Sequence, residues 1–286
     1  MKINVVTVES GWILKKIADR IINAGIADVA WSQTIYNTKG DVDANLYVDI
    51  SCCFSAPTST YDVGIFTHLD KDSMSTFNDK WKNMDHIIHM SSKYYDMFLE
   101  KVPKEKMTLL YPFDVSHFPL KKPTIGIFQR GGYVGKGMDF MKEILSQEIA
   151  KNFRFLFVGK DWGGELALAK AKGVEVENFS DEIYANYQAL YAKTDFVLIP
   201  SMWEGGPMAI VEALAQGIPI ISADVGWANR DFPVDYIYPP GNINALEGIL
   251  KKIIEPLLLK RNKVENINFK HFAQTTVDII RKGTGK

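Results

Sequence analysis

Two scarcities limit what this chain can be. Only two of its 286 residues are cysteines, Cys52 and Cys53, and a disulfide between such neighbours would be strained and rare. No run of residues approaches the roughly 18 apolar residues that a membrane span requires, and the first ten residues lack the long apolar stretch of a secretory signal. The sequence therefore predicts a cytoplasmic protein, outside oxidising compartments.

An excess of positive charge is also missing. Lys and Arg number 33 against 34 Asp and Glu, which gives a formal net charge of −1. Proteins that bind nucleic acid generally show a basic excess, so no nucleic-acid partner is expected. Neither domain opens with a G-x-G-x-x-G loop, and this disfavours a dinucleotide-dependent oxidoreductase.

Short apolar runs alternate with segments of helix length, most regularly after Thr124. Strands that are apolar almost throughout and are separated by helices indicate a parallel sheet covered on both faces. The predicted strands are 125–129, 153–158, 174–177, 196–199 and 219–222, and the predicted helices are 138–150, 164–172, 181–193 and 207–216. The first 110 residues show the same alternation less clearly, with strands at 3–8, 63–67, 86–90 and 107–110 and a helix at 14–24.

The alternation predicts an α/β chain of two Rossmann-like domains with parallel sheets. Three prolines in residues 112–123 mark a linker. We therefore expect a short amino-terminal domain over 1–115, a second domain over 116–255 and a helical tail over 256–286. The tail carries lysines between apolar residues, so it could lie on an anionic bilayer surface. Packing back onto the first domain is the preferred interpretation.

The segment 199–219 carries most of the chemistry. Its sequence is Ile-Pro-Ser-Met-Trp-Glu-Gly-Gly-Pro-Met-Ala-Ile-Val-Glu-Ala-Leu-Ala-Gln-Gly-Ile-Pro. This pattern predicts a strand end, a glycine loop and a helix that begins at Pro207 and stops at Gly217. Free amides at such a helix start attract anions, and ligands of doubly wound sheets bind at this edge. Glu204 and Glu212 flank the loop and could accept hydrogen bonds from sugar hydroxyls, or could be ordinary solvated residues of a loop and a helix face.

In register, the residues Pro-Ser-x-x-Glu-Gly-x-Pro-x-x-x-x-Glu-Ala-x-Ala-x-Gly-x-Pro resemble the signature of glycosyltransferase family 4. These are retaining enzymes of the GT-B fold, in which two Rossmann-like domains face a cleft. Weaker matches occur in the family's order: 111–118 at the domain junction, Arg130 with Lys136-Gly137, 157–159 at a strand end and 239–242 near the end of the second domain. The resemblance covers residues 107–255 well and the first domain loosely.

The resemblance implies a role for each candidate residue. Arg130 and Lys136 would grip a donor diphosphate, Glu204 would contact the sugar or the diphosphate, and Glu212 would hold the ribose. The backbone of Gly205, Gly206, Pro207 and Met208 would complete the cradle. In the first domain, Gly11 would allow close approach of the donor and His68 would face its sugar. Without the resemblance, Arg130 and Lys136 could be surface cations and His68 a structural residue.

Two segments depart from the family pattern, and one further motif is a competing candidate for metal binding. Residues 226–231, Gly-Trp-Ala-Asn-Arg-Asp, stand where the family usually has Gly-Gly-x-x-Glu, and Tyr111-Pro-Phe replaces Pro-Asn-Gly. Asp41-Val-Asp43 is compatible with a metal-binding Asp-x-Asp, but it follows polar residues and predicts a solvated turn.

Metal ligands and aromatic stacking complete the candidates. His86 and His89 form a strand pair without a third ligand, so no metal site is predicted. The spacing of Tyr184, Tyr187 and Tyr191 favours core packing on a helix, although one ring could stack near a donor base.

Together these features predict a glycosyltransferase that moves a sugar from a nucleoside-diphosphate sugar, with UDP or GDP, to an acceptor hydroxyl with retention. The acceptor would be a carbohydrate, a lipid-linked molecule or a protein, and neither a metal nor a cofactor is expected. A sugar-nucleotide epimerase or hydrolase on the same fold, and a non-catalytic nucleotide-sugar-binding subunit, remain alternatives. The sequence does not decide the base, the sugar, the acceptor or the oligomeric state.

Overall fold

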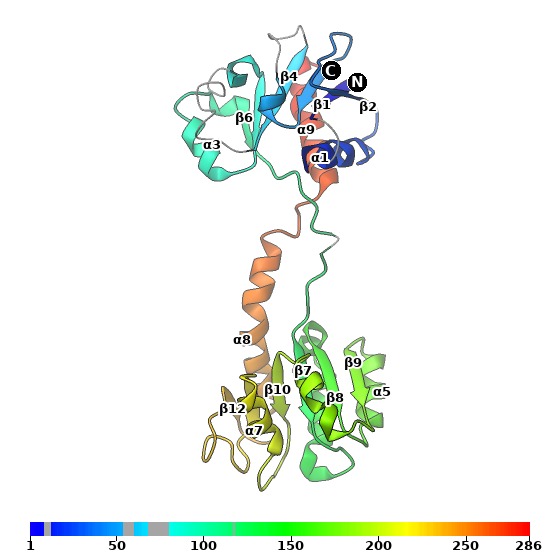
Figure 1. Ribbon diagram of the computed structural model, residues 1–286, viewed down its shortest axis with the longest axis vertical. Helices are drawn as coiled ribbons and strands as arrows, with labels where there is room; N and C mark the ends of the chain where they lie inside the picture. The colour runs from blue at the N-terminus through cyan, green and yellow to red at the C-terminus, as the bar shows by residue number, and fades with distance from the viewer. Residues whose placement is uncertain (9–12, 54–59, 68–79, 117) are drawn as a thin grey trace. The chain divides into compact units, whose positions relative to one another are not determined.

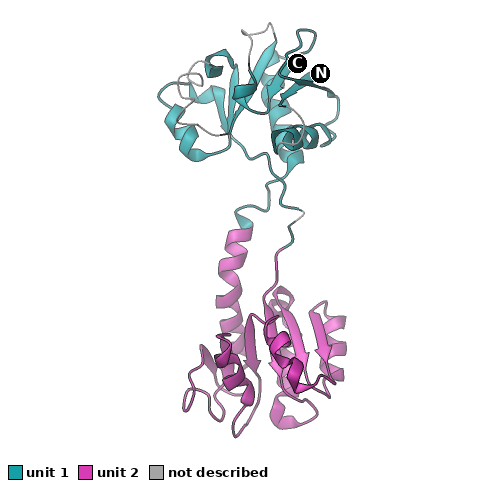
Figure 2. Cartoon of the chain, viewed as in Figure 1, with its two compact units in different colours: residues 1–119, 262–286 teal, residues 120–261 magenta. Residues whose placement is uncertain are grey.

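The computed structural model describes residues 1–8, 13–53, 60–67, 80–116 and 118–286 (Figure 1). The chain divides into two compact units, the first made of residues 1–119 and 262–286 and the second of residues 120–261 (Figure 2). Sequence places the boundaries at 115 and 255, whereas the structure divides the chain at 119 and 261. Each unit contains one six-stranded sheet, and this confirms the predicted α/β class with a parallel sheet in each domain.

The strands of the first unit are all parallel and follow the order β2-β1-β3-β4-β5-β6. They are β1 (Lys2–Thr7), β2 (Ala30–Ile35), β3 (Ala44–Tyr47), β4 (Tyr61–Phe66), β5 (His86–His89) and β6 (Met107–Leu109). The helices are α1 (Ile13–Ile22), α3 (Ser92–Phe98) and α9 (Phe269–Thr284), with 3-10 turns η1 (Ile50–Cys52), η3 (Trp81–Asn83) and η4 (Lys104–Lys106).

Helix α9 belongs to the core of the first unit although it comes last in the chain. Its buried side chains recur every three or four residues, which makes one apolar face: Phe269, Phe272, Ala273, Thr276, Val277 and Ile280. This face packs with α1 and the sheet in one apolar cluster (Figure 1). The Asn268 side chain caps the helix by accepting a hydrogen bond from the His271 amide at 2.8 Å.

A row of buried polar side chains crosses the first sheet. Asn4 on β1 donates to Asn45 on β3 at 3.1 Å, and Asn45 donates to Asp62 on β4 at 3.2 Å. All three residues are buried. Asn4 also donates to Thr34 on the edge strand β2 at 3.0 Å. Hydrogen bonds along the row satisfy groups that would otherwise be costly to bury.

The second unit has the strand order β12-β11-β10-β7-β8-β9, again parallel. Its strands are β7 (Thr124–Phe128), β8 (Arg154–Val158), β9 (Glu175–Phe179), β10 (Phe196–Ile199), β11 (Ile220–Ala223) and β12 (Tyr236–Tyr238). Its helices are α4 (Met138–Leu145), α5 (Gly163–Ala171), α6 (Tyr187–Tyr191), α7 (Met208–Ala215) and α8 (Ile243–Asn262), with 3-10 turns η5 (Val134–Lys136), η6 (Glu148–Asn152) and η7 (Tyr184–Asn186). Strand order reverses between β7 and β10, and doubly wound sheets bind ligands at the carboxyl ends of the strands beside such a point.

Several elements differ from the sequence prediction for physical reasons. Strands β2, β3 and β12 were not predicted: β2 is a half-exposed edge strand, β3 carries a buried asparagine, and β12 is only three residues long. The helix predicted over 181–193 is a 3-10 turn followed by the five-residue α6. Helix α7 begins at Met208, with Pro207 in extended conformation as its N-cap instead of its first residue.

Candidate functional site

A pocket of about 390 Å³ lies where β7 and β10 end, beside the reversal of strand order. Its lining comes from the ends of these strands and the segments that follow them, from η7 and α6, and from α7: Phe128, Gln129, Arg130, Lys136, Tyr184, Tyr187, Ile199, Glu204, Gly206, Pro207, Met208, Ala209 and Glu212. Seven of the ten predicted site residues are in this lining. Gly205 is an exposed neighbour of the lining, while Gly11 and His68 lie outside the described residues.

The two charged residues Lys136 and Glu204 pair directly in this pocket. The Lys136 ammonium forms an ion pair with Oε1 of Glu204, whose side chain is only 13% exposed. The hydroxyl of buried Ser201 lies 2.9 Å from the same oxygen. Glu204 is therefore a partly buried, hydrogen-bonded carboxylate, and Lys136 is part of the same arrangement.

Glycine makes the approach of these two segments possible. Gly137, which follows Lys136, has φ +74°, and a Cβ there would lie 2.0 Å from the carbonyl oxygen of Pro200. Only glycine adopts this conformation readily and leaves that space empty. Gln129 adds a further tie, because its side-chain amide donates to the Lys136 carbonyl at 2.8 Å. The loop after β7 is thus fixed against the end of β10.

Arg130 lies at the rim of the pocket, with its side chain 77% exposed. Its Nε donates to Oδ2 of Asp161 at 2.8 Å, and Asp161 has the left-handed φ of 66°. The indole of buried Trp162 donates to the Gln129 carbonyl at 2.9 Å. The segment after β8 therefore holds the segment that carries Arg130.

Glu212, which also lines the pocket, accepts hydrogen bonds from two tyrosines. The Tyr184 hydroxyl donates to Oε1 at 2.6 Å, and the Tyr191 hydroxyl donates to Oε2 at 2.5 Å. The bond to Glu212 raises the pKa of Tyr184 above its usual value, while burial first and this bond second raise the pKa of Tyr191. Glu212 is thus a held acceptor of hydrogen bonds.

The three tyrosines divide their roles. Tyr191 packs in the core, stacked on Phe128 with ring centroids 3.7 Å apart, as the predicted aromatic stripe requires. Tyr184 and Tyr187 line the pocket instead.

The start of α7 faces the pocket between the two carboxylates. Gly206 precedes it, and a Cβ there would lie 2.3 Å from the indole ring of Trp227. The segment 226–231, which departs from the family pattern, thus packs its tryptophan against the glycine loop. At the other end, Gly217 has φ +68° and the Ile218 amide bonds the Ala213 carbonyl at 3.0 Å, which stops the helix as predicted.

Sequence reasoning missed the residues that hold the candidates in place: Gln129, Asp161, Trp162, Ser201 and Trp227. Each acts through a hydrogen bond or a packing contact between segments distant in sequence. Ser201 stands inside the recognised signature, so its position gave one usable signal. The others follow no local pattern.

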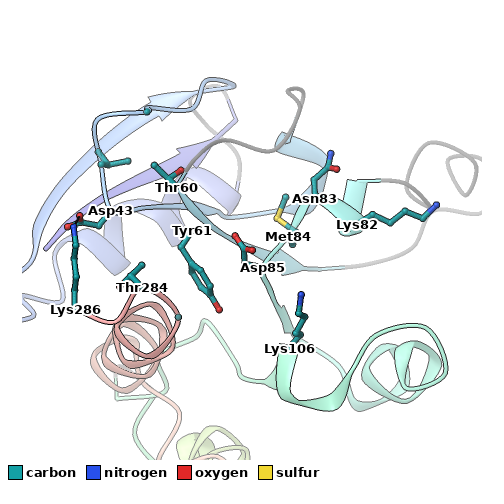
Figure 3. Close-up of a pocket in the computed structure, with 13 residues that line it drawn as sticks. Asp43, Thr60, Tyr61, Lys82, Asn83, Met84, Asp85, Lys106, Thr284 and Lys286 are labelled. Atoms are coloured by element: carbon teal, nitrogen blue, oxygen red, sulfur yellow. Dashed lines mark hydrogen bonds and ion pairs between the residues drawn. The ribbon is translucent and has the colours of Figure 1, made fainter.

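A larger pocket of about 660 Å³ lies in the first unit (Figure 3). It is lined by residues that immediately precede strands, including Asp43 before β3, Asp85 before β5 and Lys106 before β6. This is the amino end of the sheet, opposite the edge where doubly wound sheets bind ligands. Asp43 pairs with Lys286 and accepts the Lys2 amide at 2.7 Å, so it is a structural anchor, whereas Asp41 is exposed. None of the predicted site residues that the structure describes lines this pocket.

His86 and His89 are buried in β5, as a strand pair should be. His86 Nε2 lies 2.9 Å from the Thr108 hydroxyl, while neither ring nitrogen of His89 has a partner. Burial lowers the pKa of each to about 4. Within the described residues, no three His, Cys, Asp or Glu side chains are grouped so that they could hold a metal ion.

Cys52 and Cys53 are not joined in a disulfide, and both are buried. None of the helices that the structure describes combines the length and apolar character needed to span a bilayer.

Comparison with known proteins points to the same unit. The family model described as Glycosyl transferases group 1 matches residues 122–255, which is nearly all of the second unit. Protein CapJ of Staphylococcus aureus is 30% identical over 122 residues, which are 41% of this chain and 30% of CapJ. The chain thus spans less than a third of the length of this relative.

Solved structures that resemble the chain include two proteins that are matched over nearly their whole length. The lipopolysaccharide outer core galactosyltransferase WaaB in its apo form is 16% identical, with a TM-score of 0.42 over 99% of this chain and 100% of that chain. Anabaena HepE in complex with UDP-glucose is 16% identical, with a TM-score of 0.40 over 100% of this chain and 98% of that chain. The residues matched by the family model, 122–255, include every residue that lines the candidate pocket.

Proposed function

We propose that the chain is a retaining glycosyltransferase that moves a sugar from a nucleoside-diphosphate sugar to an acceptor hydroxyl, without a metal ion. The observation that carries this proposal is the pocket at the strand-order reversal. It combines two cations, the start of α7 and two held carboxylates. The Glycosyl transferases group 1 match over the same residues supports it.

The donor diphosphate would bind between Arg130, Lys136 and the first amides of α7. Arg offers a planar fork to phosphate oxygens, and Lys offers a compact charge. Helix starts attract anions because their amides are free and the helix dipole is positive there. Glu212, held by its tyrosines, would accept hydrogen bonds from the ribose hydroxyls at the other end of the nucleotide.

The cations would also lower the reaction barrier. As the bond between the sugar and the diphosphate breaks, negative charge grows on the departing phosphate. Fixed positive groups stabilise this charge more than the ground state, and such groups are worth about 2.7–4 kcal/mol each in other enzymes. The departing phosphate oxygen would accept the proton of the acceptor hydroxyl as the new glycosidic bond forms.

Glu204 would stand beside the sugar or the departing phosphate. In the donor-free structure its partners are Lys136 and Ser201. When the donor binds, the Lys136 ammonium would contact its diphosphate as well as the Glu204 carboxylate. Glu204 would then fix the position of this ammonium beside the diphosphate. Its charge would therefore affect the chemical step more than the binding of the donor.

A nucleotide panel tests the binding half of the proposal. UDP, GDP, ADP and CMP are added to the full chain in thermal-shift measurements, with and without a chelator. A ligand at about 100 times its Kd adds roughly 2.7 kcal/mol of stability, which gives a visible shift. One diphosphate should stabilise the chain with or without the chelator. Stabilisation by none of them would contradict the proposal, and loss with the chelator would contradict metal independence.

Steady-state kinetics test the two carboxylates. Glu212→Gln should raise the donor KM more than it lowers kcat, because ribose does not change during the reaction. Glu204→Gln should lower kcat more than donor affinity. Wild-type kinetics in both variants would show that neither glutamate is a site residue.

The dependence on acceptor separates the proposal from its rivals. A transferase releases nucleoside diphosphate only with acceptor present, whereas a hydrolase releases it without acceptor. Epimerisation of the donor sugar would identify an epimerase. Tight donor binding without any turnover would identify a binding subunit.

A further inference from the structure

The two tyrosines that bond Glu212 sit in opposite surroundings. Tyr191 is buried and stacked flat on Phe128. Tyr184 is 64% exposed and belongs to the three-residue turn η7. Moving the Tyr191 side chain away from Glu212 would disrupt core packing. Moving Tyr184 away would break one hydrogen bond and uncover little apolar surface.

Tyr184 also belongs to the lining that two neighbouring pockets share. It lines the candidate pocket together with Glu212, and both residues line a neighbouring pocket of about 370 Å³. Tyr191 lines only the second of these. The Tyr184–Glu212 hydrogen bond is therefore the contact that faces the candidate pocket. The hydrogen bond from Tyr191 holds the carboxylate from the side of the neighbouring pocket.

A ribose hydroxyl and a tyrosine hydroxyl are the same kind of donor to a carboxylate oxygen. With Tyr184 at 2.6 Å from Oε1 and Tyr191 at 2.5 Å from Oε2, each oxygen of Glu212 already has a short, charge-assisted bond. A ribose diol that bonds the carboxylate from the pocket would meet the Tyr184 hydroxyl first.

We propose that Tyr184 caps Glu212 in the empty site and is displaced by the ribose diol, while Tyr191 remains as the positioning residue. This inference rests on the proposed function and deepens it, because it makes Tyr184 a determinant of specificity. A nucleotide with both ribose hydroxyls replaces the lost bond when Tyr184 leaves. A nucleotide that lacks the ribose hydroxyls leaves Tyr184 bonded to Glu212 and gains no binding free energy from this carboxylate.

The two tyrosines should then have effects of opposite sign on nucleotide affinity. Tyr184→Phe removes a competitor, so UDP should bind about 2- to 10-fold more tightly, the range expected for one net hydrogen bond. Tyr191→Phe removes the support of Glu212, so UDP should bind more weakly by a similar factor. A role of Tyr184 in positioning would instead make both variants weaker.

The experiment measures the Kd of the full chain by calorimetry for UDP and for 2′,3′-dideoxy-UDP. Another diphosphate with its dideoxy analogue replaces them if the nucleotide panel selects a different base. Tyr184→Phe should tighten UDP and leave the dideoxy analogue unchanged. Tyr236→Phe, on β12 and outside the pocket lining, is the matched control and should bind both like the wild type. Circular dichroism checks that each variant folds.

The outcomes separate the inference from the proposed function. Unchanged or weaker UDP binding by Tyr184→Phe, with normal binding by the wild type, overturns this inference alone. An equal gain for UDP and its dideoxy analogue also overturns it, because the gain would then not involve the ribose diol. If no nucleoside diphosphate binds the wild type, the proposed function fails and this inference fails with it.

Discussion

Each unit has its own six-stranded parallel sheet, but charged side chains gather at the strand ends in one unit and at the strand starts in the other. In the second unit, Lys136, Glu204 and Glu212 meet where strands end. In the first, Asp43, Asp85 and Lys106 gather where strands begin. All five histidines also lie in the first unit and none in the second. We therefore base the proposed site on its position at the strand ends and not on the size of the pocket.

The largest expected effect is a loss of stability of the second unit. Gly137→Ala places a Cβ against the Pro200 carbonyl at a left-handed position, so we expect a loss of about 4 kcal/mol or more. Gly173→Ala is the control: it has the same φ of +74° but nothing within 4 Å, so it should lose only about 1–2 kcal/mol. Urea denaturation gives both values. Equal losses would mean that the approach to Pro200 does not matter.

The second effect compares a lysine from each pocket. Lys136→Ala should lower kcat by about 100- to 1000-fold, because it removes a cation from the departing phosphate. Lys106→Ala, in the pocket of the first unit, should leave kcat and the donor KM at wild-type values. Steady-state rates with one donor and one acceptor provide the measurement. A large loss of kcat in Lys106→Ala would instead place the site in the first unit, at the amino end of its sheet.

The third effect is a pH dependence confined to the first unit. Burial lowers the pKa of His86 and His89 to about 4 from 6.5, with the Lys282 charge also acting on His86 and His86 on His89. The unfolded chain therefore takes up protons first. Stability is complete above about pH 6.5 and falls as the pH drops toward 4, by up to about 3 kcal/mol for one histidine.

Hydrogen exchange checks this dependence strand by strand. Amides of β4 and β5 should lose protection between pH 6.5 and 4 before those of β7 and β8. His89→Leu should reduce the effect, and His271→Gln, at an exposed position of α9, should retain it. Parallel loss in both units at the same pH would contradict the assignment to histidine.

The smallest effect concerns the start of α9. Asn268→Ala removes the side-chain cap of the His271 amide, so the first unit should lose about 1 kcal/mol. Asn266→Ala is the neighbouring control, because Asn268 bonds only the backbone carbonyl of that residue. Thermal unfolding of the two variants gives the difference. Equal melting temperatures would show that the cap contributes little.

The second unit was the more predictable of the two because its strands are uniformly apolar and its signature is continuous. Strands such as Arg154–Val158 and Phe196–Ile199 carry buried side chains on both faces. The sheet of the first unit contains polar residues: β2 is a half-exposed edge strand, and the buried Asn45 in β3 forms hydrogen bonds with Asn4 on β1 and Asp62 on β4. Such partners lie on other strands, so no local pattern reveals them.

The site shows the same limit. The signature locates Glu204 and Glu212 at the pocket, but it does not show what holds them. The Tyr184 and Tyr191 hydroxyls reach Glu212 from 28 and 21 residues away, and Asp161 reaches Arg130 from 31. Their positions depend on how neighbouring loops fold over the sheet ends.

The place of α9 in the first unit also sets an order of assembly during synthesis. The α9 residues, Phe272, Val277 and Ile280 among them, complete an apolar cluster whose members outside this helix are translated long before. Residues 120–261 contain every strand and the whole core of the second unit. On a ribosome, the second unit can therefore close first. In the first unit, part of the apolar surface stays exposed to solvent until α9 has been synthesised.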